Sequence, residues 1–132
     1  MRWGWGPFGK SGYAGLYRSG AKHWGSQRVH PAVTLNGAQG PALQTRLIHH
    51  IDRDISDMLA RLDRYSTARA KDLRESGDIG SARRNLRRVA TRFWKCYIGR
   101  RGYREGLYGF LIAVCAGMYP ILSYMKARYE KE

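Results

Sequence analysis

Twenty consecutive residues without a single charge, Gly106 to Met125, constrain this chain more than any other feature. A helix that crosses a bilayer needs about twenty residues at about 1.5 Å rise each, so the segment is long enough to span one. Glycine, proline and serine interrupt its apolar character, at Gly106, Gly109, Gly117, Pro120 and Ser123. Because Pro120 is expected to bend the helix and basic residues flank both ends, we expect a shallowly inserted helix or a bent pair in one leaflet.

The preceding segment, residues 80–104, carries only basic charges. Its apolar positions follow a helical spacing that predicts a helix from Ser81 to about Ile98, and residues 99–102 (GRRG) should end it. Aromatic rings beside long cationic stems suit a membrane interface, although a basic helix packed on its own protein is the alternative. The residues expected to dock on anionic lipid are Arg84, Arg87, Arg88, Phe93, Trp94, Tyr97, Phe110 and Leu111.

The overall charge agrees with an anionic partner but does not identify it. The chain has 24 Lys and Arg against 10 Asp and Glu, a formal net charge of +14, which favours phospholipid, nucleic acid or a diphosphate. Nucleic acid is the less favoured partner, because the apolar segment would have no role in binding it. The first forty residues contain few aliphatic side chains, so we expect part of the buried surface to be supplied from outside.

A further helix is predicted after Asp54, which is a suitable N-cap, and Gly77 should end it near Arg74. Its apolar face should comprise Ile55, Met58, Leu59, Leu62, Tyr65 or Ser66, the Arg69 stem and Leu73. Residues 1–40 lack periodicity and predict loops and short extended pieces, while residues 42–48 fit a strand or the approach to a helix. The expected fold is therefore mostly α with an irregular, short-strand N-terminal part, divided at residues 1–50, 51–79 and 80–132.

Two groups of polar residues are candidates for chemistry. Asp52 and Asp54 form an Asp-x-Asp beside His49 and His50, a pattern that can hold a divalent metal on a diphosphate, but Asp54 fits better as a helix cap. A second group contains His23, Trp24, Arg28 and His30, where a histidine can ligate a metal or hydrogen-bond in a loop. The two cysteines, Cys96 and Cys115, lack a metal-ligand spacing and are expected to be buried packing residues in a reduced, cytoplasmic setting.

Six short motifs in order together resemble the carboxyl-terminal half of bacterial family 2 glycosyltransferases, closest to the lipopolysaccharide-core and beta-1,4-glucosyltransferase-like branch. They are GLYRSGAKHWG (15–25), RVHP (28–31), LIHH (47–50), LARLDRYST (59–67), RFWKCYI (92–98) and GYREGLYGF (102–110). The resemblance covers nearly all of the chain from about residue 12.

This resemblance implies the C-terminal portion of a GT-A type α/β enzyme at the cytoplasmic face of the bacterial inner membrane. Such an enzyme transfers a sugar from a nucleotide donor to a cell-envelope glycan or lipopolysaccharide core with Mg²⁺ or Mn²⁺. By the same resemblance Arg18, Arg28 and His30 would touch the donor diphosphate or the metal.

The chain departs from the family in lacking the strand-rich amino-terminal half with its acidic metal motif and catalytic carboxylate. The sequence is therefore expected to be a fragment or a partner-dependent part of such an enzyme, inactive alone and without a cofactor of its own. A nucleotide sugar would bind only together with a separate catalytic half. A small basic membrane-associated interaction protein is the alternative.

Overall fold

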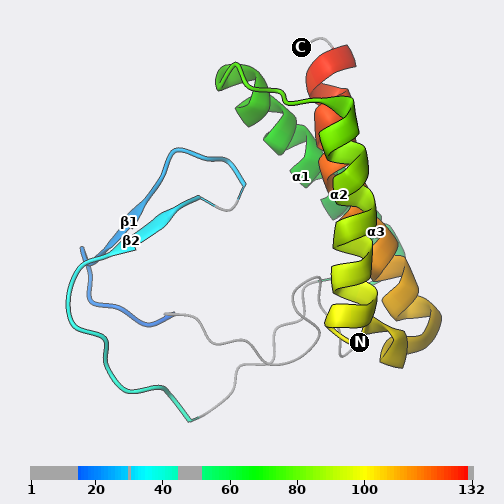
Figure 1. The fold of residues 1–132 in the computed structure, drawn as a ribbon. Coiled ribbons are helices and arrows are strands. Elements are labelled where there is room, and N and C mark those ends of the chain that lie inside the picture. The colour runs from blue at the N-terminus through cyan, green and yellow to red at the C-terminus, as the bar shows by residue number, and fades with distance from the viewer. Residues whose placement is uncertain (1–14, 30, 45–51, 131–132) are drawn as a thin grey trace.

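The computed structural model describes residues 15–29, 31–44 and 52–130. The described chain is predominantly helical with one small antiparallel sheet, which confirms the mostly α fold with a short-strand N-terminal part. Figure 1 shows the sheet to one side and the helices together on the other. The elements are β1 (Lys22–Trp24), β2 (Val33–Leu35), α1 (Ile55–Glu75), α2 (Ala82–Trp94), the π-helical turn η1 (Lys95–Gly99), the 3-10 turn η2 (Gly102–Glu105) and α3 (Gly106–Tyr129).

The two strands form a hairpin with three residue pairs, from Lys22 opposite Leu35 to Trp24 opposite Val33. The Lys22 ammonium lies 4.6 Å from the centre of the Tyr17 ring and 3.7 Å from that of Trp24. A cation between two aromatic faces is electrostatically favourable and restrains both rings. The aromatic residues of this segment that the structure describes therefore hold the hairpin together locally. Residues 42–44 belong to neither helix nor strand, and the rest of the ambiguous 42–48 segment lies outside the described residues.

Helix α1 begins and ends where the sequence predicts. The Asp54 carboxylate accepts a hydrogen bond from the Asp57 backbone N–H at 2.8 Å, so Asp54 is the N-cap. The helix ends at Glu75, and Gly77 follows with φ of +71°, a conformation that glycine adopts without steric cost.

The buried face of α1 is narrower than the sequence predicts and is rotated from it. Met58, Leu62, Ser66 and Ala70 are buried at steps of four residues. Ile55 and Leu59, which the sequence assigns to the same apolar face, remain nearly half exposed. Ser66 and Ala70 in this row are small, so α3 can approach α1 closely. The contact therefore runs along the ridge that residues four positions apart form on α1.

Helix α2 also starts as predicted, with the Ser81 hydroxyl accepting from the Arg84 backbone N–H at 3.3 Å. The helical path continues through η1 to Gly99, which confirms the expected end near Ile98. Arg101 then adopts a left-handed conformation with φ of 58°, and the chain reverses into α3. The GRRG segment thus breaks the helix, as the sequence indicates.

Helix α3 runs without interruption from Gly106 to Tyr129, so the apolar segment is one helix and not a bent pair. It lies between the other two helices: α3 contacts α1 on one side and α2 on another, whereas α1 and α2 do not approach each other. The core formed along α3 contains Met58, Leu62, Cys96, Ile112, Ala113 and Cys115. Both cysteines are free and buried, as predicted.

Small residues on α3 determine how closely α2 and the η2 turn can pack against it. A Cβ added at Gly117 would lie 2.9 Å from the carbonyl oxygen of Val89 in α2. One added at Gly109 would collide with the carbonyl oxygen of Gly102 and lie 2.8 Å from the Cβ of Glu105. With Ala113 between them, these glycines form a row of small residues at four-residue spacing, which permits close backbone approach between helices.

Candidate functional site

One side of the helical layer exposes a continuous set of large apolar side chains. On α3 the exposed or half-exposed apolar residues recur at steps of three and four, and on α2 and its turn the large ones are separated by eight and four residues. Leu107 is the most exposed of them at 88%, and Leu86 follows at 66%. We call this surface the apolar face, and it comprises Leu86, Trp94, Ile98, Leu107, Phe110, Val114, Met118, Ile121 and Met125.

Aromatic contacts join the α2 and α3 parts of the apolar face. The ring of Phe93 lies 5.6 Å from Trp94 and 5.7 Å from Phe110, both edge to face, and 5.5 Å from Tyr97 in a stacked arrangement. Such pairs stabilise by roughly 0.5 to 1.5 kcal/mol beyond area burial. The rings therefore hold Trp94, which is 58% exposed, and Phe110, which is 45% exposed, in fixed positions on one surface.

The arginines of α2 have no carboxylate partner. None of its five arginines, Arg83, Arg84, Arg87, Arg88 and Arg92, forms an ion pair with an acid among the described residues. Several described acids instead pair with other bases or cap backbone groups: Asp52 pairs with Arg61, Asp63 with Lys126, and Asp78 accepts from the Gly80 N–H. The charge of α2 is thus available to an external anion.

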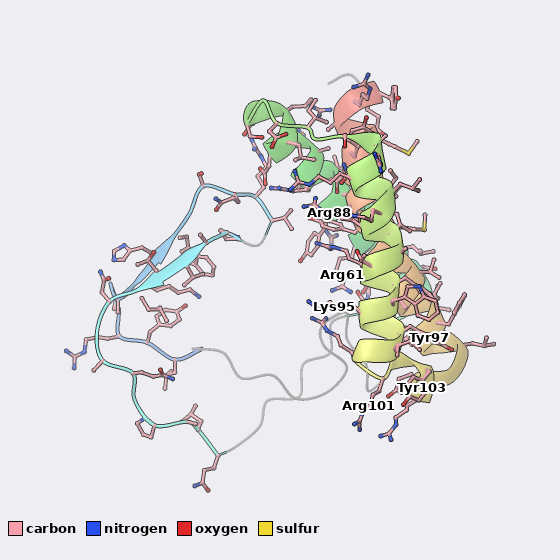
Figure 2. All side chains as sticks on the ribbon, in the orientation of Figure 1. Arg61, Arg88, Lys95, Tyr97, Arg101 and Tyr103 are labelled. Atoms are coloured by element: carbon pink, nitrogen blue, oxygen red, sulfur yellow. The ribbon has the colours of Figure 1, made fainter. Side chains whose placement is uncertain are left out.

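These arginines do not all point the same way. Arg88 and Arg92 lie two residues after Leu86 and Ala90, which places them about 160° around the helix from those residues. Figure 2 shows Lys95 projecting toward the hairpin, on the same side as Arg61, while Tyr97 projects on the other side. Arg83 and Arg87, by contrast, border the apolar face, and together with Ser81, Arg84 and Leu86 they line a shallow surface hollow at the start of α2.

The face opposite the apolar face centres on Tyr119. The Arg92 guanidinium lies 5.6 Å from the centre of the Tyr119 ring. Burial raises the pKa of Tyr119, the positive charges of Arg69 and Arg92 lower it, and the negative charge of Asp72 raises it. Burial also lowers the pKa of Arg92, and the neighbouring charge of Arg88 lowers it further. An arginine of α2 therefore lies over a tyrosine of α3.

The residues predicted to touch a donor diphosphate are not brought together as a free site. The Arg28 guanidinium binds both Asp72 and Glu75 of α1, and its backbone N–H donates to Asp72 at 3.1 Å. The hydrogen bonds that Arg28 donates to Glu75, and then those to Asp72, raise the pKa of Arg28 far above its ordinary value. We call this contact the arginine clasp, and it connects the hairpin loop to the end of α1. Arg18 is exposed, and His30 lies outside the described residues.

The Asp-x-Asp pattern does not fit a divalent metal in this arrangement. Asp52 pairs with Arg61 at 2.6 Å, and both side chains are largely buried. Asp54 caps α1, and His49 and His50 lie outside the described residues. Over residues 15–29, 31–44 and 52–130, no three His, Cys, Asp or Glu side chains gather in a way that would hold a metal ion.

The predicted docking residues are distributed over several environments. Trp94 and Phe110 lie on the apolar face, and Arg87 borders it. Phe93, Tyr97 and Leu111 are half buried and pack against the core, while Arg84 and Arg88 are exposed on α2. Leu107 and Met118 also lie on the apolar face and are absent from the predicted docking residues, although the i, i+3, i+4 spacing of α3 indicates both.

Helix α3 with its preceding turn, Gly102–Tyr129, is long and apolar enough to cross a membrane, by length and composition. Of its most apolar stretch of eighteen residues, 39% is buried inside the protein. The chain matches no protein-family model, no curated protein and no solved structure.

Proposed function

We propose that this protein binds the surface of an anionic membrane through the apolar face, with the axes of α2 and α3 roughly in the membrane plane. The observation that carries the proposal is the continuity of exposed Leu, Met, Trp and Phe side chains across two helices, bordered by arginines without carboxylate partners. Apolar patches of this kind mark interaction sites, and a basic border selects anionic headgroups.

The packing of α3 favours lying at the surface over crossing the bilayer. One side of α3 contacts α1, which carries charged residues along its exposed face, and another contacts the arginine-bearing α2. A crossing orientation would bring those charges into the hydrocarbon, at about 2.5 to 3.5 kcal/mol for each one at the centre. A parallel orientation immerses the apolar face and leaves the charges in water or among headgroups.

The resemblance of the six motifs to glycosyltransferases enters the proposal only as the proposed origin of this chain. The resemblance supports a partner-dependent piece of a glycosyltransferase acting at the cytoplasmic face of the inner membrane, and the membrane-binding surface agrees with that location. The described residues supply no metal group, and Arg28 is bound to carboxylates of α1. Transfer would therefore depend on a separate catalytic half with its own metal site.

Vesicle binding tests the proposal directly. We would measure sedimentation with vesicles of phosphatidylglycerol and phosphatidylcholine for the wild type, Leu107→Glu and Trp94→Glu. Burying one such side chain contributes about 1.5 to 3 kcal/mol, so each variant should bind roughly ten- to a hundredfold more weakly. Both side chains are well exposed, so the fold should tolerate the changes, whereas replacing Phe93 would disturb the ring cluster.

Leu16→Glu is the matched control, because Leu16 is 81% exposed but lies before the hairpin and away from α2 and α3. It should bind vesicles as the wild type does. Equal binding by all four proteins would refute docking through the apolar face. A transfer assay with nucleotide sugars and Mg²⁺ or Mn²⁺, comparing the chain alone with the chain joined to the coding sequence immediately upstream, tests the proposed origin. Activity only in the joined form would support it.

A further inference from the structure

Three arginines near the start of α2 surround one hollow at the edge of the apolar face. The hollow is shallow, has a volume of about 650 Å³, and is lined by Ser81, Arg83, Arg84, Leu86 and Arg87. Arg83 and Arg84 lie four and three residues before Arg87, the spacings at which side chains of one helix are neighbours. Leu86 is 66% exposed and belongs to the apolar face, so the hollow adjoins the surface that meets lipid in the proposed orientation.

We propose that this hollow binds the phosphate of a lipid whose headgroup is a phosphate monoester, and that the protein prefers such lipids to other anionic lipids of equal charge. The inference rests on the proposed membrane function and deepens it, because it names the headgroup that the docked protein holds. The phosphate lies among the guanidinium groups of Arg83, Arg84 and Arg87, and Leu86 contacts the glycerol and acyl carbons beside it.

The charges of these arginines are not neutralised within the described chain. None of the three forms an ion pair with a carboxylate among the residues that the structure describes. The nearest acid along the chain, Asp78, accepts a hydrogen bond from the Gly80 N–H at 3.1 Å. Like charges four residues apart on a helix destabilise it. An anion in the hollow removes this repulsion, so its binding also stabilises the start of α2.

A phosphate monoester suits three guanidinium groups better than a phosphodiester does. It presents three terminal oxygens and carries close to two negative charges at neutral pH, whereas a diester has two such oxygens and one charge. Each guanidinium is a planar fork of N–H donors that binds phosphate oxygens in pairs. Ser81 already caps α2 by accepting from the Arg84 N–H at 3.3 Å, so the arginine side chains, and not the helix end, make the site.

The apolar part of the hollow favours a lipid over a free phosphate ion. Leu86 gives no favourable contact to inorganic phosphate, but it can cover the carbons that follow the phosphate of a lipid. Immersing the apolar face in the acyl region also brings the adjoining arginines to the depth of the headgroups.

Sedimentation with two kinds of vesicle tests the preference. Both contain phosphatidylcholine, one with phosphatidic acid and the other with phosphatidylglycerol, and their surface charges are matched by electrophoretic mobility. We expect the wild type to bind the phosphatidic acid vesicles about tenfold more tightly, the effect of one additional charged hydrogen bond. Arg83→Gln and Arg87→Gln should each remove most of this preference.

Arg88→Gln is the matched control, because Arg88 carries the same charge on the same helix and does not line the hollow. General attraction to an anionic surface acts on both kinds of vesicle, so this variant should weaken both and leave the ratio of affinities within about twofold of the wild type. Equal binding of both vesicles by the wild type, or loss of the preference in Arg88→Gln, would overturn the site. Far-ultraviolet circular dichroism confirms that each variant remains folded.

Leu107→Glu separates this inference from the membrane-docking proposal. It should weaken binding to both kinds of vesicle and leave the preference between them. Docking that depends on Leu107 but shows no headgroup preference would overturn only the site in the hollow. No binding to either kind of vesicle would overturn both proposals.

A titration without a membrane distinguishes lipid phosphate from free phosphate. Dihexanoyl phosphatidic acid below its micelle concentration and inorganic phosphate are each added to the full chain while the Nε–Hε signals of the arginines are followed by NMR. We expect the short-chain lipid to shift Arg83, Arg84 and Arg87 saturably and to bind more tightly than inorganic phosphate. Equal affinity for the two probes would overturn the lipid assignment, and shifts spread evenly over all arginines would overturn the site.

Discussion

Replacing Gly109 by alanine tests whether α3 and the η2 turn approach each other as closely as the structure shows. The new methyl group would collide with the Gly102 carbonyl oxygen and lie 2.8 Å from the Glu105 Cβ. The first of these is a backbone atom, so the turn itself must move. Overpacking of this kind costs typically 1 to 3 kcal/mol, and a rigid backbone neighbour places the cost at or above the upper end.

Alanine also favours the helix over glycine by about 1 kcal/mol, so the net loss of unfolding free energy for Gly109→Ala should be about 2 kcal/mol. For a helical unit of this size each kcal/mol lowers Tm by about 4 to 8 °C. We therefore expect a fall of roughly 10 °C, measured by circular dichroism at 222 nm. Gly117→Ala, opposed by the Val89 carbonyl oxygen at 2.9 Å, should show a smaller fall.

Gly99→Ala is the control, since its added Cβ meets nothing within 4 Å and the residue lies in the helical turn η1. It should be as stable as the wild type or up to about 1 kcal/mol more stable. The reasoning is refuted if Gly109→Ala melts at or above the wild-type temperature, or if Gly99→Ala melts as low as Gly109→Ala.

Three other measurements follow from the structure. Asp52→Asn should lower the unfolding free energy by about 3 kcal/mol in urea titrations, because it leaves the buried Arg61 charge without its carboxylate, and an unchanged midpoint would contradict this. The hydrogen bond from the arginine clasp lowers the pKa of Glu75, so its contribution to stability is present above the ordinary value of 4.5 and is lost as pH falls through the lowered folded value. The protection of the amide hydrogens at the clasp, which is the exchange rate relative to its intrinsic value at the same pH, should therefore decrease only in that acidic range. Burial raises the pKa of both thiols, Cys96 and Cys115, so iodoacetamide at pH 8 should modify them far more slowly in the native chain than in urea.

Local sequence signals placed the helices well. The Asp54 and Ser81 caps, the glycine after α1 and the GRRG break all act through neighbouring residues, and the structure has each of them where the pattern indicates. Burial of the two cysteines was also predictable, because each lies within an apolar run. Such features depend on interactions within about four residues of the chain.

Which side of each helix is buried was less predictable. The apolar pattern of α2 includes both Val89, which packs toward α3, and Trp94, which is exposed. On α1 Ser66 is buried and not Tyr65, Ala70 is buried although the apolar pattern omits it, and Ile55 and Leu59 remain nearly half exposed. When the apolar surface of a helix is wider than the strip that one neighbouring helix covers, either side of that surface can be buried. Only the position of the neighbouring helix decides which side it is.

By itself, then, the sequence determined the limits of α1 and α2, the uncharged character of residues 106–125 and the excess of positive charge. The tertiary structure decided that α3 would lie between α1 and α2, because Gly117 on α3 admits the α2 backbone and small residues on α1 admit α3. That packing left the apolar face uncovered and placed the arginines of α2 on two sides of that helix. It also engaged Arg28 with Asp72 and Glu75, more than forty residues away, a pairing that no local pattern specifies since it depends on how distant segments meet.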